Sequence, residues 1–292
     1  MKIFDYQIPQ DIKEAVALLE ARGERARVIG GGTALFALMK ERLVSPECLV
    51  ELKGLSDLKF LLLADGDLRI GAMTTLTEIE RSPVVRKGVP FLSEVVAKVA
   101  SRRLRNQITL GGCLAYGETA SDPPAACLAL DASVRAVRKG HSRTLEVKDL
   151  FVDQYETCLK AGEVISEITI PKPKENSIFG HYKFTPRSKA DKPTLGIAVR
   201  LDPAPDGRSC TDARVAFSNA ARTPMRSAAA ERALCGRPLD EGAFGAAAEA
   251  AWGEVNPPDD VYCTGAYKRE MVRVLLPRLL RQVAAGRSSG RL

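Results

Sequence analysis

Three consecutive glycines most constrain how this 292-residue chain can fold. They follow the β-like run 26–29 and precede an apolar-periodic segment, 34–40, so the sequence predicts a strand, a glycine turn and a helix. Without side chains, residues 30–32 let backbone N–H groups come close to an anionic group, and the helix N-terminus adds favourable partial charge. The turn is a candidate diphosphate site, although glycine turns that bind nothing have the same composition.

Two better-known glycine loops are excluded by the neighbouring residues. The dinucleotide fingerprint needs a small residue where Leu35 stands, and the phosphate loop of NTPases needs a Gly-Lys-Ser/Thr sequence that is absent here. A second glycine pair lies within 106–112, where the helical periodicity breaks and we expect another glycine-bearing turn. Thr109 offers a hydroxyl there, and Asp122 offers an acceptor for sugar or ribityl hydroxyls; alternatively, Asp122 is a helix N-cap before two prolines.

Composition and charge narrow the classes of protein. The chain is 45% hydrophobic and 27% charged, which is typical of a globular protein with a substantial core. We expect no membrane span, no signal peptide and a cytoplasmic location, because no apolar run is long enough. The net charge of +7 comes from basic residues interleaved with acids, which argues against a nucleic-acid groove. Seven scattered cysteines predict neither a disulfide framework nor a metal site.

The remaining periodicity predicts a mixed order of helices and strands. A helix is expected at 11–20, capped by Gly23, and a linker at 171–176 precedes a third domain of antiparallel strands and helices. The other expected elements are strands or hairpins at 48–52, 61–74, 180–183, 196–201 and 213–218, and helices at 77–80, 91–100, 227–234, 243–252 and 267–285. The tail 286–290 is expected to be mobile.

Several motifs in a shared order resemble those of one flavoprotein family. They are Ile29-Gly30-Gly31-Gly32-Thr33-Ala34-Leu35, Ile70-Gly71-Ala72-Met73-Thr74-Thr75, Arg105-Asn106-Gln107-Ile108-Thr109-Leu110-Gly111-Gly112, Ala120-Ser121-Asp122-Pro123-Pro124-Ala125 with Ala129-Leu130-Asp131-Ala132, and Tyr182-Lys183-Phe184 before Asp191. Over nearly its whole length the chain resembles the FAD-binding medium subunit of molybdenum hydroxylases. That group includes carbon monoxide dehydrogenase, xanthine dehydrogenase and 4-hydroxybenzoyl-CoA reductase.

The resemblance implies an α+β fold with three parts. These are two FAD-binding subdomains of the vanillyl-alcohol-oxidase/PCMH type, at 1–55 and 56–172, and an antiparallel-sheet-plus-helices domain at 173–292. It also implies FAD contacts along 28–35 and 109–113 at the diphosphate, at Asp122 for a hydroxyl, at Ile165 for the adenine end and at Lys183 near the flavin ring. The implied cofactor-binding residues are Val28, Ile29, Gly30, Gly31, Gly32, Thr33, Ala34, Leu35, Thr74, Thr109, Gly111, Gly112, Cys113, Asp122, Ile165 and Lys183.

The resemblance further implies how the work is divided. The chain would hold FAD and no metal or catalytic acid–base pair, taking electrons from 2Fe-2S clusters on a small subunit and passing them to a soluble acceptor such as NAD, a quinone or ferredoxin. A large subunit would carry the molybdopterin-type molybdenum cofactor. In the basic C-terminal helix, the apolar residues Val272, Leu275, Leu276, Leu279 and Leu280 would help to form the interface, or else close the domain's own core.

Departures from the family pattern keep other interpretations open. Cys113 stands where the family usually has Asn, and 116–119 replaces a more typical Ala-Ser-Pro run. Both histidines, His141 and His181, are interpreted as structural or surface residues, and Lys183 by itself as an exposed lysine on an edge strand. A stand-alone flavin oxidase and a basic ligand- or nucleic-acid-binding module without cofactor remain the alternatives.

Overall fold

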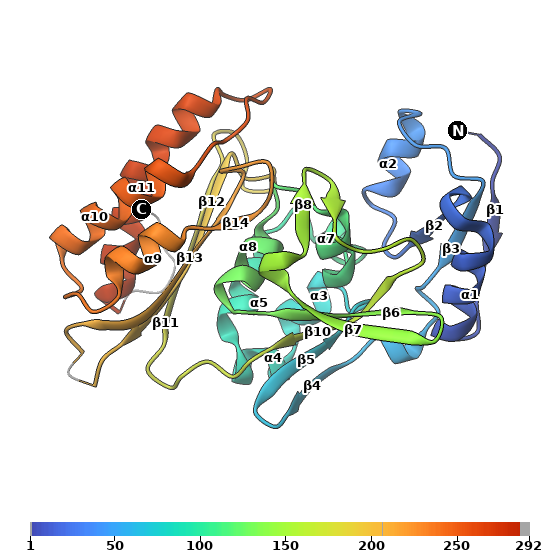
Figure 1. Ribbon diagram of the computed structural model, residues 1–292, viewed down its shortest axis with the longest axis horizontal. Helices are drawn as coiled ribbons and strands as arrows, with labels where there is room; N and C mark the ends of the chain where they lie inside the picture. Colours follow the sequence, from blue (N-terminus) through green and yellow to red (C-terminus); the bar gives the residue numbers. More distant parts are fainter. Residues whose placement is uncertain (1, 206, 287–292) are drawn as a thin grey trace. The chain divides into compact units, whose positions relative to one another are not determined.

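The computed structural model describes residues 2–205 and 207–286 and divides them into two compact units (Figure 1). The first unit runs up to Tyr116 and includes Ala132–Leu150 and Glu156–Pro171. The second consists of Gly117–Asp131, Phe151–Tyr155 and the chain from Lys172 onward. The tail expected to be mobile lies, beyond Gly286, outside the described residues.

A small parallel sheet in the first unit carries the triple-glycine turn. Its strands are β1 (Asp5–Gln7), β3 (Cys48–Glu51) and β2 (Ala26–Ile29), in that order. Helix α1 (Ile12–Arg22) packs on one face, and the short helix α2 (Leu35–Lys40) on the other. The predicted helix is confirmed together with its caps: Asp11 accepts from the Glu14 N–H, and Gly23 ends the helix at φ 55°.

A five-stranded antiparallel sheet forms the rest of the first unit. Its order is β4 (Leu61–Ala64), β5 (Asp67–Gly71), β10 (Val164–Ile170), β6 (Ser133–Arg138) and β7 (His141–Glu146), which confirms the predicted hairpin. Figure 1 shows α3, α4 and α5 together along this sheet, where α4 contacts β4 and β5. The helices are α3 (Leu76–Arg81), α4 (Pro83–Gly88), α5 (Pro90–Ala97), α6 (Arg102–Arg105) and α7 (Leu110–Tyr116). Short 3-10 turns at Gly23–Arg25, Ser56–Leu58 and Val147–Asp149 and strand β9 (Glu156–Thr157) also belong to the first unit, whereas strand β8 (Phe151–Asp153) belongs to the second.

The second glycine pair lies in a helix, which corrects one expectation. Gly111 and Gly112 occupy the first turn of α7 rather than a turn before it. The Oγ1 of Thr109 accepts a hydrogen bond from the Gly112 N–H at 3.1 Å, so this residue caps the helix from outside. This hydroxyl compensates for the low helix propensity of two adjacent glycines.

The second unit is an antiparallel sheet with helices on both faces. The strand order is β11 (Ile178–Phe184), β12 (Leu195–Pro203), β13 (Cys210–Ser218) and β14 (Met225–Arg226). Helices α9 (Ala228–Leu234), α10 (Glu241–Glu254) and α11 (Gly265–Ala284) lie along one face (Figure 1), whereas α8 (Asp122–Ala129) contacts β12, β13 and β14. The predicted strands and C-terminal helices are confirmed, and the chain has the predicted α+β class.

Alternation along β12 separates an apolar face from a polar one. Leu195, Ile197 and Val199 belong to the hydrophobic cluster formed with the C-terminal helices. The intervening residues, such as Gly196 and Arg200, point to the opposite face because successive side chains of a strand alternate. The apolar residues that the sequence offered as interface candidates, Val272, Leu275, Leu276, Leu279 and Leu280, all lie inside this cluster. They close the core of the second unit. The structure therefore supports the interpretation as core residues and not the one as interface residues.

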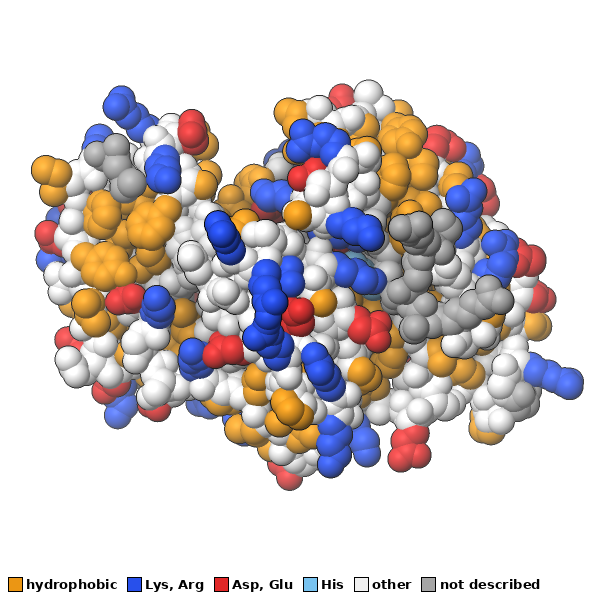
Figure 2. Space-filling model, turned by 180° about the vertical axis from the view of Figure 1, so that it is seen from behind, with side chains coloured by type: hydrophobic (Ala, Val, Ile, Leu, Met, Phe, Trp, Pro, Cys, Tyr) orange, Lys and Arg blue, Asp and Glu red, His pale blue; other side chains and the backbone are white. Residues whose placement is uncertain are grey.

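Two arginines of α11 are paired with acids of α10 at the surface of the second unit. Arg273 and Arg281 of α11 form ion pairs with Glu249 and Glu241 of α10. On the face shown in Figure 2, basic side chains have acidic and apolar neighbours. No helix within the described residues is long and apolar enough to cross a membrane. Nor do the described residues include a group of three His, Cys, Asp or Glu side chains that could hold a metal ion.

Candidate cofactor site

The two glycine segments of the first unit touch each other. A Cβ atom added at Gly31 would lie 1.7 Å from the backbone oxygen of Gln107, and one added at Gly30 would lie 3.3 Å from the Thr109 Oγ1. Glycine at position 31 is therefore required for the close approach of the two loops. Gly32 has φ +70°, a left-handed conformation that also favours glycine. The sequence predicted both segments, and the structure brings them together.

The first glycine segment presents backbone N–H groups that the described residues leave available. Within that part of the chain, no hydrogen bond is donated by the N–H groups of Gly31, Gly32, Thr33 or Ala34. All four residues are partly exposed, so a ligand can reach them. A run of N–H groups before a helix is suited to a diphosphate.

The second glycine segment uses its N–H groups internally. The N–H of Leu110 donates to the Thr74 carbonyl at 3.1 Å and that of Gly111 to the Ala72 carbonyl at 3.0 Å. The N–H groups of Gly112 and Cys113 both donate to Thr109, the first to its hydroxyl and the second to its carbonyl. This segment therefore packs against the loop 30–34 and fixes its position. It does not offer a ligand a second row of N–H donors.

The other predicted residues of the first unit have mixed environments. Thr74 is buried, and its hydroxyl donates to the Phe60 carbonyl at 3.0 Å, so this side chain stabilises the fold. Ile29 is buried at the end of β2, with Val28 partly buried beside it and Leu35 packed against the same small core as Ile29. Ile165 lies on β10, paired with Ala136 of β6, and is 4% exposed.

Asp122, the main predicted polar residue, begins α8 in the second unit. Its Oδ1 lies 3.2 Å from the His181 Nε2, and its Oδ2 lies 3.3 Å from the Lys183 Nζ. Both partners come from β11, two positions apart and therefore on the same face of the strand. The N-cap interpretation of Asp122 is wrong, because Ser121 holds the cap position and no side chain caps this helix.

Burial and charge act against each other on Asp122. Burial alone would raise the pKa of this carboxyl, but the hydrogen bond and charge of His181, followed by the charge of Lys183, lower its pKa below the usual value. The side chain of Lys183 is only 6% exposed, so it is not the exposed lysine that its edge strand suggested. Sequence reasoning did not assign His181 to this site, although its spacing of two residues from Lys183 was the available signal.

A glycine on the polar face of the sheet makes room for the Asp122 carboxylate. Lys183, Gly196 and Ser218 are aligned across β11, β12 and β13. A Cβ at Gly196 would lie 2.1 Å from the Ser218 Oγ and 3.1 Å from the Asp122 Oδ1. The missing side chain thus lets α8 approach the polar face of the sheet closely.

The segment before α8 is well anchored within the second unit. Glu118 is 8% exposed, and its Oε1 accepts from the Lys192 Nζ at 2.5 Å. The Thr119 hydroxyl donates to the Ala221 carbonyl at 2.8 Å, and its own carbonyl accepts from the Asn219 N–H at 2.9 Å. The segment 117–121 is therefore held by contacts within the second unit.

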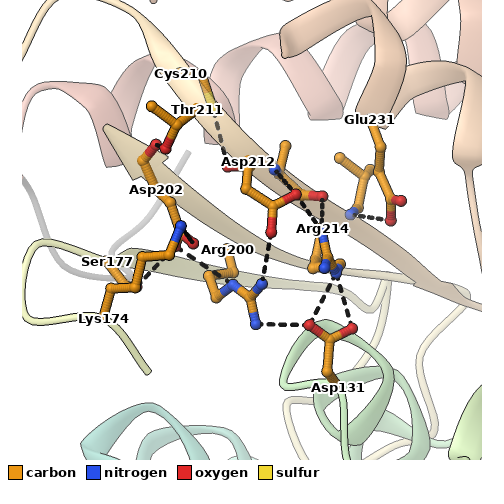
Figure 3. Close-up of polar contacts among 12 residues, drawn as sticks. Asp131, Lys174, Ser177, Arg200, Asp202, Cys210, Thr211, Asp212, Arg214 and Glu231 are labelled. Atoms are coloured by element: carbon orange, nitrogen blue, oxygen red, sulfur yellow. Dashed lines mark hydrogen bonds and ion pairs between the residues drawn. The ribbon is translucent and has the colours of Figure 1, made fainter. Parts of the chain in front are cut away.

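A second acid, Asp131, anchors the other end of α8 (Figure 3). Its carboxylate pairs with Arg200 at 2.9 Å, Arg214 at 2.8 Å and Arg226 at 2.7 Å. In turn, these arginines contact Asp202, Asp212 and Glu231. With Lys174, which pairs with Asp202 at 3.2 Å, four bases meet four acids, so the network leaves little net charge for a ligand.

Comparison with known proteins gives consistent results. Residues 2–173 match the family model described as the FAD binding domain in molybdopterin dehydrogenase, and residues 180–283 match the CO dehydrogenase flavoprotein C-terminal domain. The carbon monoxide dehydrogenase medium chain of Afipia carboxidovorans is 32% identical over 282 residues, 97% of this chain and 97% of that one. The nicotine 6-hydroxylase medium subunit of Paenarthrobacter nicotinovorans is 32% identical over 280 residues, covering 96% and 97%.

Solved structures agree over the same length. A structure of carbon monoxide dehydrogenase from Hydrogenophaga pseudoflava matches with a TM-score of 0.94 and 32% identity, covering 97% of this chain and 98% of that one. Quinoline 2-oxidoreductase from Pseudomonas putida 86 matches with a TM-score of 0.90 and 31% identity, covering 98% and 99%. Fold and site together define a flavoprotein subunit of an oxidoreductase. The chain belongs to the FAD-binding medium subunits of the molybdenum hydroxylase family.

Proposed function

We propose that this chain is the electron-transfer subunit of a molybdenum-containing dehydrogenase complex. Its FAD would accept electrons from 2Fe-2S clusters on a small subunit and pass them to an external acceptor, while a large subunit with the molybdenum cofactor oxidises the substrate. The names of the relatives support the assembly, since several are called medium chains or subunits of a dehydrogenase complex. A cytoplasmic location and a soluble acceptor, whether NAD, a quinone or ferredoxin, are part of the proposal.

The available N–H groups of Gly31, Gly32, Thr33 and Ala34 are the observation that carries the FAD assignment. A diphosphate needs several donors that are not already used, and this loop supplies them next to a helix. We propose that 28–35 contact the diphosphate directly. The segment 109–113, with Gly111, Gly112 and Cys113, would contribute mainly by fixing that loop, because its N–H groups are already bonded.

The remaining contacts are proposed by residue type. Ile165 offers an apolar surface to the adenine end, and Lys183 offers a positive charge to the flavin ring. Asp122 would act on a sugar or ribityl hydroxyl, or through Lys183, which it already binds. When bound, FAD supplies the redox chemistry; the protein orients it and sets the charge around it.

Cofactor analysis of the purified chain, alone and with coexpressed partner subunits, tests the proposal. We expect about one FAD per chain and neither iron nor molybdenum in the isolated subunit, since the chain has one glycine cradle and no cysteine motif for a cluster. In the complex, anaerobic substrate should bleach the flavin absorbance, whereas the isolated chain should not respond to substrate. Iron at about four atoms per chain would contradict the single-cofactor claim, because the chain itself would then hold an iron–sulfur cluster. Oxidation of an organic substrate by the isolated chain would instead favour the oxidase alternative.

A further inference from the structure

We propose that His181 is a positioning residue for the flavin site: by holding Asp122, it fixes the Lys183 ammonium and limits the positive charge that Lys183 presents to FAD. The inference rests on the proposed function, because it assumes that Lys183 faces the flavin. It adds a residue that neither the motifs nor the family match assign to the site.

The geometry makes Asp122 a shared counter-ion. Each carboxylate oxygen has its own partner, with the His181 Nε2 at 3.2 Å from Oδ1 and the Lys183 Nζ at 3.3 Å from Oδ2. Since a carboxylate only accepts, the first contact requires that Nε2 of His181 carry the proton. Because His181 donates to Oδ1, that oxygen is the weaker acceptor for a second donor, and Lys183 is held at Oδ2 rather than drawn between the two oxygens.

Burial makes this arrangement matter. The side chains of Asp122, His181 and Lys183 are 1%, 0% and 6% exposed, so water screens their charges poorly. The carboxylate of Asp122 offsets the charge of the Lys183 ammonium beside it. A flavin near Lys183 would therefore experience a dipole of defined direction rather than a full positive charge.

The surrounding sheet and helix α8 hold Asp122, His181 and Lys183 close together. On the face that carries His181 and Lys183, the neighbouring positions on β12 are Ala198 and Gly196. These small residues leave the space that the first turn of α8 fills. At its far end, the same helix is followed by Asp131, which three arginines hold. The position of the Asp122 carboxylate is thus fixed by both ends of α8.

Reduction potentials of FAD bound to four variants of the whole chain test the proposal. Asp122→Asn removes the counter-charge, so the exposed positive charge should favour reduced FAD and raise the potential. Lys183→Met should lower it. A tenfold change in the ratio of reduced-to-oxidised binding constants corresponds to about 30 mV for this two-electron couple. We expect shifts on that scale, of opposite sign for the two variants.

A matched pair of substitutions tests the positioning role of His181. His181→Leu removes the donor, which lets Asp122 draw Lys183 into a two-oxygen contact and should lower the potential by a smaller amount than Lys183→Met. His181→Gln keeps an N–H donor and should restore the wild-type value. Potentials that do not move in His181→Leu, with only a lower melting temperature, would reduce this residue to a packing role. Equal shifts in the leucine and glutamine variants would also overturn the proposal.

Failure of the underlying function has a different signature. If the wild-type chain binds no FAD, the proposed function fails before any potential is measured. If FAD binds normally and the potentials of the Asp122 and Lys183 variants shift in the same direction, the function stands and the counter-ion role is wrong. Should Asp122→Asn fail to fold, the His181 pair still decides the inference.

Discussion

In residues 30–32 the glycines leave a row of N–H groups available, whereas at 111–112 the N–H groups are bonded to Ala72 and to Thr109. Both glycine segments allow close backbone approach, but the first is partly exposed, whereas Gly111 of the second is buried against Ala72. We therefore expect the first segment to contact the ligand and the second to support the first. A glycine-rich motif can therefore contain residues whose substitution affects binding and others whose substitution affects only the fold.

Substitution of the residue where the two segments meet should have the largest effect. In Gly31→Ala, the new Cβ would overlap the Gln107 carbonyl, so one of the loops must move. We expect FAD affinity to fall by about 100-fold, or about 2.7 kcal/mol, measured by titration with flavin fluorescence. Gly54→Ala is the matched control, because nothing lies within 4 Å of its Cβ position. Unchanged affinity in Gly31→Ala would show that the contact between the loops is not needed for binding.

Gly111 should behave as a folding residue. A Cβ there would lie 2.6 Å from the Ala72 Cβ and 2.7 Å from its carbonyl oxygen, so Gly111→Ala should destabilise the chain by about 1–3 kcal/mol. The melting temperature should fall by a similar amount with and without FAD. A loss of FAD affinity at unchanged melting temperature would give Gly111 a direct ligand role instead.

The Thr109 hydroxyl caps the helix of the second segment, and its removal should have a smaller effect. Thr109→Val keeps the shape but removes the acceptor for the Gly112 N–H, which should cost about 1 kcal/mol of stability, as for other helix caps. Urea unfolding of the two proteins measures this difference. Thr33→Val is the control, because Thr33 lies in the loop 30–34. A stability loss of the same size in that variant would contradict the supporting role that is assigned to the second segment alone.

Lowering the pH should reduce stability by protonating buried carboxylates, whereas the backbone N–H groups of the glycine loop do not titrate. Stability should not change near neutral pH. Burial alone would raise the pKa values of Asp122 and Asp131, yet His181 and Lys183 lower the first, and Arg214, Arg200 and Arg226 lower the second. Because the folded-state pKa values are depressed, the stabilisation is present above about pH 4 and lost as the pH falls through them. Thermal unfolding between pH 2 and 7 tests this. Asp131→Asn should flatten the dependence, and an equally steep loss in that variant would contradict it.

The sequence predicted structures that depend on contacts between residues close together in the chain. It did not predict those that depend on contacts between distant residues. The helix at Ile12–Arg22 was predictable because its caps, Asp11 and Gly23, are adjacent to it. The helical placement of Gly111 was not, because the supporting acceptors come partly from Ala72, far along the chain. Glycine propensity alone suggested a turn there.

The same limit applies to the polar site. The motif identified Asp122, but its partners lie about 60 residues away on β11, and only the folded sheet brings them to it. Alternation could place His181 and Lys183 on one face, yet it could not tell which face meets α8. The apolar residues of α11 show the reverse case: their spacing was clear, and only the packing showed that they lie in the core.

Backbone amide exchange with and without FAD tests which glycine segment binds the diphosphate. We expect FAD to slow hydrogen exchange at Gly31, Gly32, Thr33 and Ala34, whose N–H groups donate to nothing else within the described residues. The amides of Leu110, Gly111, Gly112 and Cys113, already bonded in the protein, should exchange slowly in both states. Strong FAD protection at 110–113 with no change at 31–34 would contradict the assignment of the diphosphate to the first glycine segment.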